Sequence, residues 1–156
     1  MILKGPCRIA VLAVTLIAAS GCSIQQTVNP VAGDVPGELC VIENPAVREG
    51  FLPEYRRALE AKGIAVRVLP ETASIKDCPL TSTYVARWSW DLTIYMSYVE
   101  INVFEGGALA GKALYDATKG GGRMDKFIDA EPKIRELVSQ LFPAGDSIVI
   151  DPGTTQ

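Results

Sequence analysis

Two short apolar runs enclose a helical pattern near the middle of the chain. Residues 39–42 are a continuous apolar run that predicts a buried strand, and residues 64–68 alternate as a second strand. Between them, apolar residues recur at helical spacing over residues 52–62. Pro53 suits the first turn of this helix and Gly63 the position just past its end. These elements predict a β-α-β unit.

Alternation continues over a longer region that predicts an antiparallel meander. Residues 84–91 alternate as one strand, and the apolar parity of the next run slips by one position at residues 98–99. Such a slip within a continuous strand predicts a β-bulge. Gly106 and Gly107 then predict a turn into a further strand over about residues 108–117.

A second helical stripe runs from Phe127 to Leu141, and Pro132 predicts either a kink or a helix that starts near Glu131. The order β-α-β-β-β-α predicts an α+β fold. We expect a two-layer sandwich, in which a mixed sheet of about five strands carries two helices on one face. The sequence does not say what covers the other face.

The first residues follow the pattern of an export signal. Lys4 and Arg8 precede an apolar run over residues 9–19, which is shorter than the ~20 residues that a membrane-spanning helix needs. The run ends in Ala19-Ser20-Gly21-Cys22, which resembles the lipobox of bacterial lipoproteins. The resemblance implies a diacylglyceryl group on the Cys22 thiol and cleavage before it. The alternative is an ordinary signal peptide cut at an Ala-x-Ala-like site.

These features divide the chain into four predicted parts. Residues 1–21 are a lipoprotein signal peptide, and residues 22–38, polar and broken by proline and glycine, are a lipidated tether. Residues 39–143 are a globular α+β domain, and residues 144–156 are a flexible tail. In Gram-negative lipoproteins, an Asp directly after the lipidated cysteine looks like an inner-membrane retention signal. This chain has Ser23 at that position. We therefore expect the inner leaflet of the outer membrane, facing the periplasm.

The charge balance limits the partners. The signal contains two of the 15 Lys and Arg residues and none of the 18 Asp and Glu residues, so the remaining chain would carry a net charge of −5. This balance argues against nucleic-acid binding and against electrostatic adhesion to anionic lipids. We expect attachment to the membrane through the lipid on Cys22, and the sequence does not identify an envelope protein or glycan partner.

Two cysteines remain once Cys7 leaves with the signal and Cys22 is lipidated. In an oxidising compartment, Cys40 and Cys78 predict one disulfide, for which the chain-entropy model gives roughly 3 to 4 kcal/mol. The alternatives are a reactive thiol pair or half of a metal site. The chain has no Cys-x-x-Cys spacing and no histidine to complete a zinc set, so we expect no metal and no cofactor.

Three sequence blocks are similar to an uncharacterised Sbal-type family of small Gram-negative lipoproteins. They are ENPAVREGFLPEYRRALEAKG, TSTYVARWSWDL and GGGRMDKFIDAEPKIRELV. The resemblance runs from the lipobox to about Phe142 and implies an envelope lipoprotein with no assigned activity. It also places Cys22 at the anchor position and Cys40 and Cys78 at matching positions. Pro132 departs from the family pattern.

The absence of histidine excludes a Ser-His-Asp or Cys-His site. Asp125 and Asp129 lie four apart on the predicted last helix, with Asp116 as a possible neighbour, so a carboxylate-dependent hydrolase is conceivable. We favour a solvated helix face.

The loop Gly120-Gly121-Gly122-Arg123 precedes a helix, where backbone N–H groups and the arginine could hold an anion. Its spacing matches no nucleotide-binding fingerprint, so we favour a plain turn.

Tyr84, Trp88 and Trp90 form an aromatic stripe on one face of a predicted strand. We favour a place in the core, while exposure would indicate a ligand surface for a lipid, glycan or peptide. Taken together, the sequence predicts a lipid-anchored envelope protein whose domain has an interaction or structural role rather than an enzymatic one, with no predicted catalytic residue.

Overall fold

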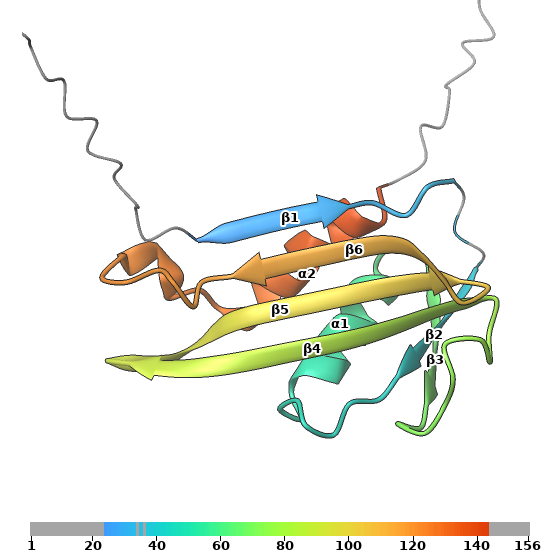
Figure 1. Cartoon of the computed structure of the whole chain (residues 1–156), viewed down its shortest axis with the longest axis horizontal. Coiled ribbons are helices and arrows are strands. Elements are labelled where there is room, and N and C mark those ends of the chain that lie inside the picture. Colours follow the sequence, from blue (N-terminus) through green and yellow to red (C-terminus); the bar gives the residue numbers. More distant parts are fainter. Residues whose placement is uncertain (1–23, 34, 36, 144–156) are drawn as a thin grey trace, which may run out of the picture.

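A computed structural model describes residues 24–33, 35 and 37–143 and contains a six-stranded sheet (Figure 1). The strands lie in the order β1-β6-β5-β4-β2-β3. Their bounds are β1 Gln25–Asn29, β2 Glu38–Ile42, β3 Ala65–Leu69, β4 Leu80–Asp91, β5 Thr93–Glu105 and β6 Ala108–Asp116. The helices are α1 Phe51–Glu60, the short 3-10 helix η1 Met124–Lys126, and α2 Ala130–Leu141.

The sheet combines a parallel part with an antiparallel part. Strand β2 pairs in parallel with both β3 and β4, and α1 connects β2 to β3. Strands β4, β5 and β6 form the predicted antiparallel meander, and β1 adds to β6 at the far edge. The α+β class, the mixed sheet and the two helices on one face are therefore confirmed, with six strands in place of about five.

The additional strand corrects the predicted tether. Gln25–Asn29 pairs with β6 over five residues, so a tether over residues 22–38 is wrong for this segment. Val31 is also buried, and its N–H donates to the Leu141 carbonyl at 2.9 Å. The sequence of β1, QQTVN, lacks an apolar alternation because this edge strand exposes most of its side chains.

Both helices pack against the sheet through one apolar face. The buried residues are Phe51, Tyr55, Ala58 and Leu59 in α1 and Ile134, Leu137, Val138 and Leu141 in α2. The Tyr55 hydroxyl forms a hydrogen bond of 2.7 Å with the Ser82 hydroxyl inside this layer. Burial raises the pKa of Tyr55 above its usual range because the phenolate would lose its hydration.

Several local predictions agree with the structure. The pairing register of β4 and β5 shifts so that Ser97 has no partner on β4, which places the bulge one residue from the predicted positions 98–99. Gly106 and Gly107 turn the chain into β6, both with positive φ. Helix α2 begins at Ala130 with Pro132 in its first turn, close to the predicted start. The predicted tail over residues 144–156 and the predicted signal over 1–21 lie outside the described residues.

Candidate functional site

The structure divides the aromatic stripe between the core and the surface. Tyr84 is buried, its ring stacks on Phe51 at a centroid distance of 4.9 Å, and its hydroxyl accepts from the Asn44 backbone N–H. Trp88 is half-buried and lies edge-on to the same phenylalanine ring. Trp90 is 75% exposed. The core prediction is therefore confirmed for Tyr84, holds in part for Trp88 and is wrong for Trp90.

Trp90 is exposed because the hairpin of β4 and β5 extends past the ends of the two helices (Figure 1). Ile94 is its direct cross-strand partner and is 58% exposed. Leu92, at the turn, is 82% exposed and adopts a φ of 62°. Met124 of η1 is also largely exposed. We call Trp90, Leu92, Ile94 and Met124 the apolar tip.

The buried Lys126 connects the β4–β5 hairpin to η1 and the loop before it, the two segments that carry the apolar tip. The Lys126 ammonium donates to the Asp91 carboxylate on the hairpin and to the Gly121 carbonyl. It also lies 5.1 Å from the ring centre of Phe127, which packs edge-on against Tyr95. The ion pair with Asp91 raises the pKa of Lys126 above its usual value. Sequence reasoning missed Lys126, since a single lysine in a polar loop gives no signal of burial.

The charged and polar groups of the glycine-rich loop are paired with nearby residues of the chain. The Arg123 guanidinium donates to both carboxylate oxygens of Asp125, and the Gly121 carbonyl accepts from Lys126. The loop leads into the three-residue η1 rather than directly into a long helix. The favoured interpretation as a turn therefore describes the segment Gly120-Gly121-Gly122-Arg123 better than an anion site.

The carboxylates considered for hydrolysis do not lie on one helix. Asp125 belongs to η1, while Asp129 is the N-cap residue of α2, so the predicted spacing along the last helix is wrong. Both side chains are exposed, and the Arg123 guanidinium lowers the pKa of Asp125. Asp116 ends β6 and accepts from the Thr118 hydroxyl and backbone N–H, which lower its pKa. An acid held as a carboxylate in this way is a poor proton donor.

The face of the sheet away from the helices carries a polar ladder. Arg87 lies over the Tyr98 ring at 4.4 Å, and the Tyr98 hydroxyl donates to Glu100 at 2.8 Å. The Glu100 carboxylate also accepts from the Asn102 amide and pairs with the Lys112 ammonium at 3.2 Å. The hydrogen bond from Asn102 is the largest of the effects that lower the pKa of Glu100. This face therefore carries a hydrogen-bonded polar network, next to which Val85, the cross-strand partner of Glu100, is also exposed.

Two shallow grooves flank the start of α1. One has a volume of about 540 Å³, the other about 370 Å³, and Arg48 lines both. The Arg48 guanidinium lies 5.5 Å from the centre of the Trp88 ring, which forms a wall of the smaller groove. Within residues 24–33, 35 and 37–143, no group of three acids, cysteines or histidines could hold a metal ion. The grooves thus offer apolar and charged contacts.

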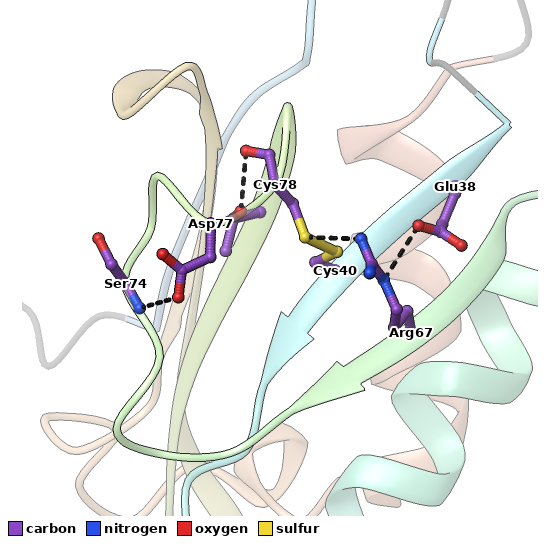
Figure 2. Close-up of a disulfide and its surroundings, with 7 residues drawn as sticks. Glu38, Cys40, Arg67, Ser74, Asp77 and Cys78 are labelled. Atoms are coloured by element: carbon purple, nitrogen blue, oxygen red, sulfur yellow. Dashed lines mark hydrogen bonds and ion pairs between the residues drawn. A yellow bond between two sulfur atoms is a disulfide. The ribbon is translucent and has the colours of Figure 1, made fainter.

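The disulfide lies near the start of β4, at the opposite end of that strand from the apolar tip. Cys40 of β2 is bonded to Cys78, and the two residues are 1% and 4% exposed. Arg67 of β3 donates to the Cys78 sulfur at 3.0 Å and pairs with Glu38 at 3.1 Å (Figure 2). The predicted bridge between Cys40 and Cys78 is confirmed, and its burial argues against a reactive thiol pair.

Solved structures with a related fold are dodecamers of PelC from Paraburkholderia phytofirmans. A point variant of PelC aligns with a TM-score of 0.50 and 11% identity, covering 76% of this chain and 94% of the PelC chain. A second PelC dodecamer in another crystal form aligns with a TM-score of 0.48 and 16% identity, covering 76% and 95%. No family model and no characterised protein sequence matches the chain. The likeness concerns the fold alone.

None of the helices in the described part of the chain is both long and apolar enough to cross a membrane.

Proposed function

We propose that the chain is a cell-envelope lipoprotein, anchored by a lipid on Cys22 in the inner leaflet of the outer membrane and facing the periplasm. The sequence Ala19-Ser20-Gly21-Cys22 carries this proposal. The Cys40–Cys78 disulfide supports it, because stable disulfides are formed in oxidising compartments. The expected resemblance to an uncharacterised Sbal-type family of lipoproteins would agree with it. The domain would bind or support another envelope component rather than catalyse a reaction.

The anchor can be tested by mass spectrometry of the N-terminal peptide after expression of the full chain in a Gram-negative host. We expect a diacylglyceryl and an acyl group on Cys22, and recovery in the outer-membrane fraction. Ser23→Asp should move the protein to the inner membrane, while Ser23→Asn should not. An unmodified mature chain that starts beyond Cys22 and is released without detergent would disprove the proposal.

The binding partner can be sought by crosslinking in intact cells followed by mass spectrometry. We expect one envelope protein or glycan to be enriched over a Cys22→Ala control that lacks the anchor. The absence of any enriched partner would favour a purely structural role.

Self-assembly is a second candidate. In the described part of the chain β1 and β3 are the edge strands of the sheet, and the PelC chain with a similar fold forms a dodecamer. Unpaired edge strands can pair with another chain, and a lysine at the edge opposes this. Val68 of β3 is partly exposed, so Val68→Lys should reduce the mass measured by light scattering in detergent. A monomeric mass for the wild-type chain would remove this candidate.

A further inference from the structure

We propose that the apolar tip inserts into the interfacial region of the same membrane leaflet that holds the lipid on Cys22. This inference rests on the proposed lipid anchor and adds a second, protein-based contact with the membrane. Among the large apolar side chains that the described residues expose, these four gather at one end: Trp90, Leu92, Ile94 and Met124. The other three, Val68, Val85 and Leu109, are scattered over different strands.

The start of the described chain lies at this same end of the sheet. Gln25 pairs with Asp116, Asp116 pairs with Tyr98, and Tyr98 pairs with Arg87, so these residues form one row across four strands. The hairpin continues beyond this row to its turn (Figure 1). Gln25 is three residue steps from Cys22, which at ~3.3 Å each span about 10 Å. A lipid on Cys22 would therefore hold this end of the domain close to the membrane surface.

The loop beside the first described residue is bonded to the hairpin. A Cβ atom at Gly120 would lie 3.6 Å from the Ile24 side chain, so the two residues are close neighbours. The next residue of that loop, Gly121, accepts from the buried Lys126 ammonium, which also binds Asp91 of the hairpin. Ile24, the loop and the hairpin turn therefore form one connected unit. A lipid on Cys22 would therefore bring this unit, with the tip, close to the membrane.

The chemistry of the tip suits a lipid interface better than open water. Tryptophan is enriched at membrane interfaces, where its ring is amphipathic. Leu92 keeps a large apolar side chain at a turn with positive φ, a conformation that favours glycine or asparagine. The charges around the tip are matched in pairs, Asp91 with Lys126 and Arg123 with Asp125. We therefore expect contact that depends on apolar burial and changes little with salt or with anionic lipid.

Quenching by brominated lipid can test this contact in the full lipidated protein. Trp88→Phe leaves Trp90 as the only tryptophan, since the chain has two. This protein is reconstituted into phosphatidylcholine vesicles with brominated or ordinary acyl chains, and in detergent as a reference. We expect the brominated chains to quench most of the Trp90 emission, with little change in high salt. The reciprocal variant, Trp90→Phe, should lose most of the quenching because Trp88 is half-buried against Phe51 of α1.

A matched pair of substitutions separates the tip from apolar exposure in general. Ile94 in the tip and Leu109 near the opposite turn are each 58% exposed. Ile94→Ser in the Trp88→Phe background should reduce the quenching to less than half, while Leu109→Ser should leave it unchanged. Equal effects of the two substitutions would overturn the proposal.

The outcomes also separate this inference from the lipid anchor. If Cys22 is lipidated but brominated chains do not quench Trp90, the anchor stands and the docking is wrong. If Cys22 is not lipidated, quenching on addition of the chain to vesicles supports docking by the tip alone, and its absence overturns it. If Ile94→Ser lowers the mass of the particle without changing the quenching, the tip is a contact between copies and the proposal fails.

Discussion

The two ends of the sheet are built from opposite kinds of interaction. Around Cys40 and Cys78, a covalent bridge is shielded from solvent, and Arg67 holds both a sulfur atom and Glu38. At the apolar tip, large side chains remain exposed and the buried charge of Lys126 joins the surrounding loops. Both ends carry internal bonds, but in the described part of the chain four large exposed apolar side chains gather at the tip, whereas Leu109 is a single one near the opposite turn.

We expect this difference to separate effects on stability from effects on the proposed membrane contact. A substitution at the disulfide end removes interactions that the folded chain makes with itself, so the free energy of unfolding should fall. A substitution of an exposed tip residue removes little from the folded state, because that side chain is already in water. Its effect should therefore be seen in contact with the membrane.

The largest effect on stability should come from removal of the disulfide. We expect the double variant Cys40→Ala, Cys78→Ala to lose about 3 to 4 kcal/mol of unfolding free energy, because its unfolded chain gains the freedom that the bridge removes. Urea denaturation monitored by circular dichroism measures this loss. The reduced wild-type chain should match the variant, whereas quenching of Trp90 by brominated lipid should be unaffected in conditions where both proteins are folded. A loss below about 1 kcal/mol would contradict the role of the bridge.

The buried aromatic residues next to the apolar tip should matter more to stability than the exposed side chains of the tip. Tyr95 is 8% exposed and its ring packs against Phe127 at a centroid distance of 5.2 Å. Tyr95→Ala should cost about 2 kcal/mol through lost apolar burial and the lost aromatic pair. Tyr95→Phe keeps the ring and should be close to neutral in the same urea titration. A similar loss in both variants would mean that the hydroxyl, and not the packing, stabilises this end.

Between the two ends, the polar ladder should make stability sensitive to acid. Hydrogen bonds from Asn102 and Tyr98 and the nearby Lys112 lower the folded-state pKa of Glu100. Its contribution is therefore present above the unfolded pKa of about 4.3 and is lost as the pH falls through the lower folded value. We expect Glu100→Gln to flatten the fall in stability below about pH 4.3. Urea titrations at several pH values test this, and an unchanged slope would assign the fall to other carboxylates.

The parts that sequence periodicity predicted are those in which one face is buried. The buried faces of α1 and α2 and the bulge near residues 98–99 follow from alternation or helical spacing, because burial imposes the pattern. Strand β1 was missed because an edge strand with exposed side chains lacks that constraint. The exposure of Trp90 could not be predicted either. Trp90 follows the same alternating pattern as Tyr84. Whether a side chain of this strand is buried depends on how far the helices extend along it, which the pattern does not show.

The smallest expected change in stability concerns Leu92 at the hairpin turn, where backbone strain and membrane contact can be measured separately. Leu92 has a φ of 62°, a conformation in which a side chain other than asparagine, aspartate or glycine costs roughly 1 kcal/mol. Leu92→Asn should therefore raise the unfolding free energy by up to about 1 kcal/mol, while Leu92→Ala keeps the strain and should not. Both variants lose the exposed apolar side chain, so both should reduce quenching of Trp90 by brominated lipid. A gain in stability together with a loss of membrane contact would mean that Leu92 is kept at the cost of strain for its contact with lipid. Unchanged quenching in both variants would remove Leu92 from the contact and leave its backbone strain without a function.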